Sequence, residues 1–273
     1  MSVFFQRHGR VLLMLIAAMS IALSGCGSSG ATTNAGAANN GGATDNGAAA
    51  NGVANNGGAG LGGAAAAFAN MSSYQFNMTL AGGTFGSLLS VLGGASASSG
   101  GAMTVTGTIV LKPEKAADIT VIGIHMIEVG GFTYMDLGTG QFMKSASTSS
   151  SLADSFAPAT MFSSAVDTSV AGGYNKVGSE DKNGVSTDHY QASTTALSAY
   201  QAMLGSELGG ATNVTWSADV WIANSGDYAG CPVSMLVEAK TSDGTAAYEV
   251  AFDLSKINDA GNKVTAPTNV MGG

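Results

Sequence analysis

The sequence predicts an α+β domain, a curved antiparallel β-sheet (a half-barrel) with helices on its concave face, preceded by a signal peptide and a disordered linker. Three observations predict it. An apolar block near the N-terminus is followed by a long stretch of small and polar residues. From about residue 65 onward, most segments alternate apolar and polar residues with a period of two, as half-buried strands do. Two segments between these strands have the spacing of helices instead.

Residues 1–25 have the layout of a secretory leader. Two arginines and a histidine lie in the first ten residues, and residues 11–23 (VLLMLIAAMSIAL) are apolar and uncharged. This block is too short to span a bilayer comfortably. The following LSGC resembles the lipobox, a motif in which the chain is cleaved before a cysteine that carries a diacylglycerol. We therefore expect Cys26 to be the lipid attachment site. The alternative is a plain signal peptide or a membrane helix with an incidental cysteine.

A flexible linker is predicted to follow the cysteine. Residues 27–64 are almost entirely Gly, Ala, Asn, Ser and Thr, with Asp45 as the single charge and no aromatic residue. Such a segment cannot bury enough apolar surface to offset the entropy of ordering its backbone. As a random coil it would have an end-to-end distance of about 35 Å and a stretched limit of ~130 Å. We expect it to tether a domain over residues 65–273.

The charge of the chain argues against nucleic-acid binding. Cleavage of the leader would remove both arginines. The mature chain would then keep eight lysines and eighteen acidic residues, which gives a net charge of −10. Bidentate recognition of phosphate depends on the guanidinium group of arginine. An acidic chain without arginine is therefore not expected to bind nucleic acid, and its negative charge favours solubility.

The domain is predicted to be a long antiparallel meander. Residues 73–80 (SYQFNMTL) and 103–111 (MTVTGTIVL) alternate cleanly, and residues 117–144 divide into four strands at glycine-containing turns. Residues 174–192 form a hairpin around Asn183-Gly184, which is the strongest short turn signal in the chain. The remaining strands are expected within three ranges, namely 214–227, 232–254 and a last piece near 263–267 (KVTAP).

Three segments break the alternation. Residues 149–166 have helical spacing interrupted at Pro158, and residues 194–208 place four apolar side chains on one helical face. Because both segments fall between strands, we expect their helices to cover the concave face of the sheet. Residues 83–94 (GTFGSLLSVLGG) are interpreted as an apolar loop or short helix.

The sequence contains no motif that predicts catalysis. It has neither a Gly-x-Ser-x-Gly elbow nor a phosphate-binding Gly-Lys-Ser/Thr loop. His125 and His189 lack zinc-ligand spacing and are interpreted as ordinary strand residues, so no catalytic residue, metal or cofactor is predicted. Cys231 is expected to be a buried, unreactive thiol.

The domain resembles the LppX/LprG-type lipoproteins of mycobacteria, which share a fold with the LolA/LolB lipoprotein carriers. Four segments between about residues 68 and 267 carry the resemblance: a strand of the type SYxFxMxL, the hairpin IEVGGFTYMDLGTGQFMK, the strand WSADVWIANSGD and the closing segment YEVAFDLSKINDAGNKVTAP. In the hairpin, Phe142 stands where the family usually has tryptophan, and in the next strand Asn224 lies a little beyond the family's usual acid.

The resemblance implies a non-enzymatic, monomeric lipoprotein that binds a lipid or lipidated ligand in an apolar cavity and carries or presents it in the cell envelope. It would be extracytoplasmic, held at a membrane by lipidated Cys26, with an outer membrane as an open destination. The side chains expected to line the cavity are Phe76, Met78, Val105, Ile109, Ile119, Val121, Tyr134, Leu197, Tyr200, Leu204 and Trp221. The alternative for each of them is ordinary hydrophobic core.

Two other functions fit the same fold. One is an envelope sensor or regulatory module, which would require a membrane-protein partner. The other is a structural surface lipoprotein with no ligand, in which the interior is filled by the domain's own side chains. Thirteen methionines, three of them in the leader, suit a site that adapts to acyl chains, but they suit a packed core equally well.

Overall fold

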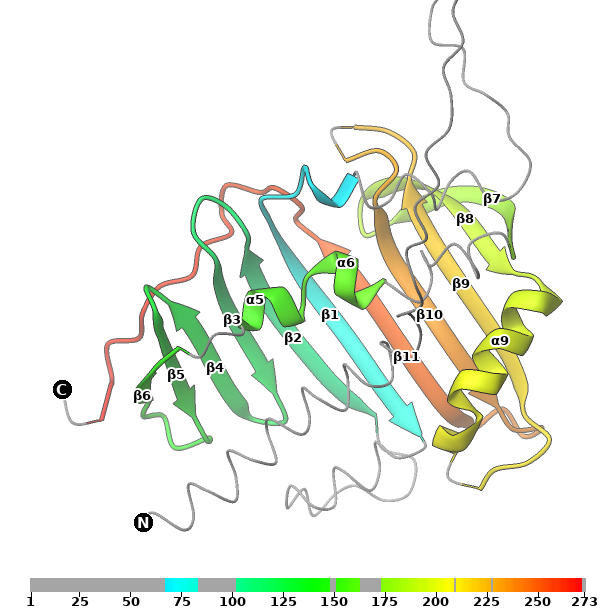
Figure 1. Cartoon of the computed structure of the whole chain (residues 1–273), viewed down its shortest axis with the longest axis horizontal. Coiled ribbons are helices and arrows are strands. Elements are labelled where there is room, and N and C mark those ends of the chain that lie inside the picture. The colour runs from blue at the N-terminus through cyan, green and yellow to red at the C-terminus, as the bar shows by residue number, and fades with distance from the viewer. Residues whose placement is uncertain are drawn as a thin grey trace, which may run out of the picture.

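The computed structural model describes residues 67–82, 102–147, 151–162, 173–208, 210–226 and 228–271. Within these residues, eleven strands form one antiparallel sheet that is curved and does not close into a barrel (Figure 1). The predicted leader, Cys26, the linker and the apolar segment at 83–94 lie outside the described residues. The α+β half-barrel predicted from the sequence is confirmed.

The order of the strands across the sheet is β6-β5-β4-β3-β2-β1-β11-β10-β9-β8-β7. The strands have the following bounds: β1 Ser73–Gly82, β2 Met103–Val110, β3 Ala116–Val121, β4 Ile124–Val129, β5 Phe132–Asp136, β6 Met143–Ala146, β7 Tyr174–Lys182, β8 Val185–Ala192, β9 Thr215–Ala223, β10 Pro232–Lys240 and β11 Ala246–Ser255. The sheet therefore consists of two meanders, β1 to β6 and β7 to β11, which are joined by the pairing of β1 with β11.

The pairing of β1 with β11 places residues from the two ends of the domain side by side. Phe76 lies opposite Leu254, and Met78 lies opposite Phe252. On its other side β1 pairs with β2, where Met78 lies opposite Val105. The centre of the sheet thus joins the first strand of the domain to its last.

The turns predicted from glycine and asparagine are confirmed. Asn183 and Gly184 join β7 to β8 with φ values of 55° and 78°, the two left-handed residues that a type I′ hairpin requires. The four strands expected within residues 117–144 are β3, β4, β5 and β6. Their tight turns carry positive φ angles, as at Gly130 and Gly131.

The described helices lie on the concave face of the sheet (Figure 1). The segment with interrupted helical spacing forms α5 (Leu152–Ser155) and α6 (Pro158–Met161), and Pro158 occupies the first position of the second helix, where proline is tolerated. The other segment forms α9 (Thr194–Leu204), which continues into the 3₁₀ helix η1 (Gly205–Leu208). None of the helices in the described part of the chain has the length and apolar character needed to cross a membrane.

The strand expected near residues 263–267 is absent from the described structure, and this prediction is wrong. After β11 the chain has no regular structure over residues 262–267 and makes a single parallel bridge between Val270 and Phe142. Val264 and Val270 instead pack on the convex face, against a cluster that includes Ile127 and Phe142. Apolar residues are buried here by an irregular segment rather than by strand pairing.

Candidate functional site

The concave face of the six central strands is an apolar layer. Every second residue of β1 points into it, and the same parity holds on the paired strands. The layer consists of Trp216, Ala218, Val220 and Ile222 of β9, Met235, Val237 and Ala239 of β10, Tyr248, Val250, Phe252 and Leu254 of β11, Tyr74, Phe76, Met78 and Leu80 of β1, Met103, Val105, Gly107 and Ile109 of β2, and Ala117, Ile119 and Val121 of β3. It carries no charged side chain.

Six of the predicted site residues on the central strands lie in this layer. The side chains of Phe76, Met78, Val105, Ile109, Ile119 and Val121 are all buried in the main core cluster. Three further predicted residues come from α9, where Tyr200 and Leu204 are buried and Leu197 is half-buried against the same cluster. The structure therefore brings nine of the eleven predicted residues together on one face.

The helices α5 and α6 reach the layer through two phenylalanines. The ring of Phe156 stacks on the ring of Phe76, with centroids 5.0 Å apart. Phe162 meets Phe252 edge to face at 5.3 Å and stacks against Phe68 at 6.0 Å. These two short helices are thus held on the sheet largely by aromatic contacts.

Three polar contacts also connect α5 to the sheet. Glu128 of β4, a buried carboxylate, accepts hydrogen bonds from the backbone N–H of Leu152 at 2.5 Å and from the hydroxyl of Ser151 at 3.2 Å. The hydroxyl of Tyr74 donates to the carbonyl of Phe156 at 2.5 Å. Burial, and next the charge of Asp154, raise the pKa of Tyr74, so this hydroxyl stays protonated and keeps its donor role.

Helix α9 is attached by a cap and a buried pair of tyrosines. The hydroxyl of Ser193 accepts from the N–H of Ala196 at the helix N-terminus. The hydroxyls of Tyr174 and Tyr200 lie 2.8 Å apart, and burial, followed by the neighbouring hydroxyl of Tyr200, raises the pKa of Tyr174. This hydrogen bond between two neutral hydroxyl groups joins α9 to β7.

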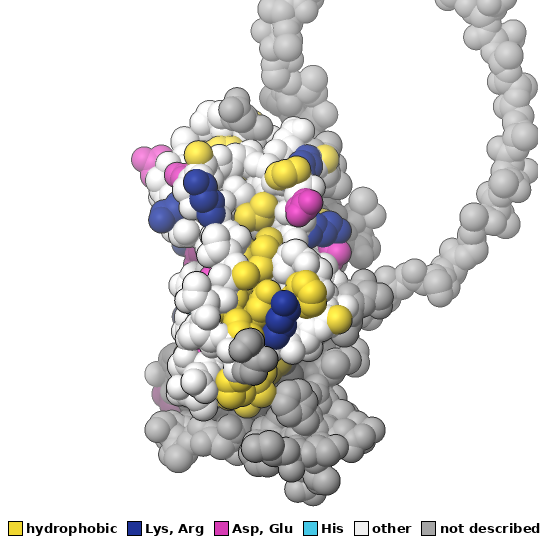
Figure 2. Space-filling view, turned by 90° about the vertical axis from the view of Figure 1, so that its left-hand side faces the viewer, with side chains coloured by type: hydrophobic (Ala, Val, Ile, Leu, Met, Phe, Trp, Pro, Cys, Tyr) yellow, Lys and Arg dark blue, Asp and Glu magenta, His cyan; other side chains and the backbone are white. Residues whose placement is uncertain are grey.

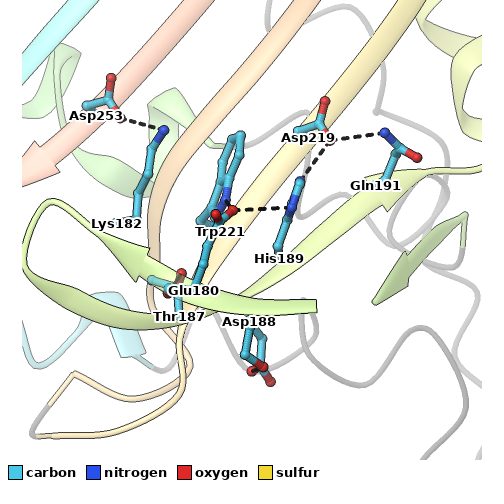
Figure 3. Close-up of polar contacts among 10 residues, drawn as sticks. Glu180, Lys182, Thr187, Asp188, His189, Gln191, Asp219, Trp221 and Asp253 are labelled. Atoms are coloured by element: carbon cyan, nitrogen blue, oxygen red, sulfur yellow. Dashed lines mark hydrogen bonds and ion pairs between the residues drawn. The ribbon is translucent and has the colours of Figure 1, made fainter. Parts of the chain in front are cut away.

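Trp221 lies on the convex face, so its assignment to the cavity lining is wrong. It forms a separate cluster with Val185, Ala223 and Val233. The indole is covered by polar side chains of the β7–β8 hairpin (Figure 3). Its Nε1–H donates to Glu180 at 2.5 Å, and the ammonium of Lys182 lies 4.2 Å from its ring centroid.

The tryptophan that does face the concave layer is Trp216, which the sequence interpretation missed. Trp216 and Trp221 are five residues apart on one strand, so alternation places them on opposite faces. In the alternating pattern of β9, Trp216 lies on the same face as Val220 and Ile222, and this could have identified it as a residue of the layer. The pattern does not show which face is concave, because β9 is buried on both faces over most of its length.

Tyr134 also lies on the convex face, and its assignment to the cavity lining is wrong. It packs with Ile127 and Phe142 under the C-terminal segment.

At the neighbouring edge of the sheet, the ammonium of Lys144 lies 3.8 Å from the ring centroid of Phe132, which is 39% exposed. Figure 2 shows hydrophobic side chains in a band along this side of the molecule, with lysines among them. This side of the molecule therefore combines apolar side chains with both lysines and acidic residues.

Both histidines of the domain form carboxylate contacts on the convex face. Nε2 of His125 lies 2.7 Å from Asp118. Nε2 of His189 lies 2.8 Å from Asp219, and Nδ1 lies 3.4 Å from Glu180 (Figure 3). Within the described residues neither ring bonds a serine hydroxyl, and no cluster of His, Cys, Asp and Glu has the arrangement of a metal site.

Cys231 is buried at the start of β10, as predicted. Its Sγ contacts the sulfur of Met71 at 3.9 Å. Burial raises the pKa of the Cys231 thiol to about 12, so the reactive thiolate is scarce near neutral pH. The arrangement is that of a core residue.

No protein-family model matches the chain, and no curated protein matches its sequence. Among solved structures, the chain is similar to the lipoprotein LppX of Mycobacterium tuberculosis, with 16% identity over 77% of this chain and 97% of that one and a TM-score of 0.42. It is similar to LprF of Mycobacterium bovis, with 14% identity over 78% and 96% and a TM-score of 0.43. It is also similar to MucB in complex with MucA(peri), with 12% identity over 78% and 59% and a TM-score of 0.34. LppX, of the family that the sequence resembles, is thus among the similar structures.

Proposed function

We propose that this protein is a membrane-anchored lipoprotein that binds the acyl chains of a lipid between the concave face of its sheet and the helices that cover it. The observation that carries the proposal is the uncharged apolar layer of β9, β10, β11, β1, β2 and β3. Each methylene transferred from water to such a layer contributes about 0.8 kcal/mol. A chain of about sixteen carbons would therefore gain on the order of 10 kcal/mol before ordering costs.

The construction of the helical cover supports this proposal. Helices α5 and α6 have four residues each, and isolated helices of this length have no stability of their own in water. They rest on the sheet through Phe156, Phe162 and a few hydrogen bonds. Acyl chains can replace such contacts with equivalent apolar ones, so the cover can separate from the sheet at modest cost in free energy.

The predicted anchor and linker give the proposal its setting. Lipidated Cys26 would hold the chain at a membrane, and residues 27–64 would let the domain move over the membrane surface within its stretched length of ~130 Å. The domain would then take a lipid from, or present it to, sites within that radius. No bond is made or broken in this function, so it needs no catalytic residue or cofactor.

Native mass spectrometry tests the proposal. The chain from residue 26, with Cys26→Ser so that no anchor lipid is attached, is exported through a cleavable leader and purified without detergent. We expect a bound mass in the range of an acyl lipid. Leu197→Glu places a charge where α9 meets the apolar layer and should remove this mass.

The matched control is Ala199→Glu, which places the same charge on an exposed position of the same helix. It should keep the bound lipid. A protein that is free of lipid in all forms would contradict the proposal, and so would a bound mass that survives Leu197→Glu unchanged while the variant remains folded.

A further inference from the structure

Within the described residues, the buried indole N–H of Trp216 has no hydrogen-bond acceptor. Trp216 lies one residue from the start of β9, on the concave face, with 8% of its surface exposed. Its ring packs against that of Tyr248 at 5.9 Å, and Ala239 lies opposite it on β10. Among the described residues, its Nε1 and the Oδ1 of Asn262 are the two buried side-chain atoms without a hydrogen-bond partner.

The contrast with Trp221 makes the missing acceptor informative. Both tryptophans come from β9, and Nε1 of Trp221 donates to a carboxylate at 2.5 Å. A buried N–H without an acceptor is destabilising, because it has given up its bond to water. Phenylalanine would provide an aromatic ring at position 216 without this cost. The presence of an indole at position 216 is therefore explained if its N–H donates to an acceptor that is not among the described residues, such as a bound ligand.

The surroundings of Trp216 define the chemistry of that acceptor. Its neighbours in the layer, Tyr248 and Ala239, carry no charge, and the nearest lysine along the paired strand, Lys240, is bound to Glu238 at 2.7 Å. A charged group would lose its hydration here without a counter-ion. The acceptor is then a neutral oxygen attached directly to a hydrocarbon chain, and the carbonyl oxygen of an acyl ester has this property.

We infer that the indole N–H of Trp216 donates a hydrogen bond to the ester carbonyl of the bound lipid, and so selects ester-linked acyl chains over ether-linked ones. The inference rests on the proposed function, because it assigns the ligand class of the same apolar face. Since Trp216 lies near the start of β9, the ester would lie near the corresponding edge of the layer. The acyl chain would extend from it across the neighbouring strands.

A pair of soluble probes tests the inference. Dioctanoylglycerol carries two ester carbonyls, and its dioctyl ether analogue has none but has the same chain length. With the Cys26→Ser chain, we expect the ester to bind roughly three- to tenfold more tightly than the ether, the range that one neutral hydrogen bond gives. Trp216→Phe keeps an aromatic ring and should reduce ester binding to the level of the ether. Trp221→Phe, the control on the opposite face, should keep the preference.

Fluorescence provides a second measurement that does not depend on the Trp216 variant folding. The chain has two tryptophans, so Trp221→Phe leaves Trp216 as the single indole. Its emission should shift to longer wavelength with the ester and should not do so with the ether. Equal binding of both probes by the wild-type chain, or a preference that persists in Trp216→Phe, would overturn the inference and leave the proposed function standing. Binding of neither probe would overturn both.

Discussion

The ring of His189 stacks on the ring of Trp221, with centroids 4.5 Å apart and planes inclined by 14°. The two residues lie opposite each other on β8 and β9. Lys182 covers the same indole, and its ammonium also lies 4.0 Å from the carboxylate of Asp253. Together these contacts cover one tryptophan with polar side chains and fasten the β7–β8 hairpin to the rest of the sheet.

We expect Trp221 to stabilise the fold without contributing to ligand binding. Trp221→Ala should lower the free energy of unfolding by about 3 kcal/mol, because it removes the centre of the convex cluster. Val177→Ala, at an exposed position of the hairpin, should change it by less than about 0.5 kcal/mol. Urea unfolding followed by circular dichroism measures both. A loss for Trp221→Ala as small as that for Val177→Ala would show that the stack does not hold the hairpin.

Gly107 is required because the layer is tight where Phe76 crosses β2. A Cβ at position 107 would lie 2.6 Å from Cε1 of Phe76 and 2.7 Å from the carbonyl oxygen of Asp118. Gly107→Ala should therefore destabilise the protein by about 1–3 kcal/mol. At Gly178, in β7, an added Cβ meets no atom of the described residues within 4 Å, so Gly178→Ala is the matched control. Thermal unfolding of the two variants should separate them clearly, and equal melting temperatures would contradict the packing described.

Acid should weaken the β7–β8 hairpin through Asp188. Burial alone would raise the pKa of Asp188, but hydrogen bonds from Asn224, Lys176 and Ser179 outweigh it and lower the pKa below its ordinary 3.8. A lowered pKa in the folded state means that the carboxylate stabilises the fold above about pH 4, and that this contribution is lost as the pH falls further.

Asp188→Asn should remove this contribution. The difference in stability between wild type and variant should be largest at neutral pH and should shrink at about pH 3, as urea midpoints at the two values would show. Asp181→Asn, an exposed carboxylate on β7, is the control. A difference for Asp188→Asn that does not depend on pH would contradict the assigned contacts.

The two cysteines should differ completely in acylation. Metabolic labelling with an alkyne-bearing palmitate should mark the wild-type chain and the Cys231→Ala variant, and Cys26→Ser should abolish the label. The reason is that the thiol of Cys231 is buried in the core, with a raised pKa, and is not available to a modifying enzyme. Label on the Cys26→Ser chain would disprove the predicted anchor.

Alternation and turn chemistry made the strands predictable. The pattern of residues 73–80 and 103–111 gave both the strands and the correct face, because β1 and β2 are buried on one side and polar on the other. The Asn183-Gly184 turn followed from the preference of these residues for positive φ. The pairing of β1 with β11 was not predictable from local pattern, since it joins segments at opposite ends of the domain.

The face of a strand was not predictable where both faces are buried. Trp221 and Tyr134 were assigned to the wrong face for the same reason, because the convex face is covered at both places. The long side chains of the β7–β8 hairpin cover Trp221. The C-terminal segment covers Tyr134. Period two then shows which residues share a face but not which face is concave. The missing strand near residues 263–267 has a related cause, since its apolar residues are buried without pairing.

Photo-crosslinking tests the central claim most directly. Palmitic acid with a diazirine in its chain is bound to the Cys26→Ser protein and activated by light, and the modified residues are located by mass spectrometry. The account predicts crosslinks on the concave side chains of β1, β2 and β9 to β11 and on α9, at residues such as Met78, Val105 and Leu197. Crosslinks confined to the convex face, around Trp221 or Tyr134, would contradict it.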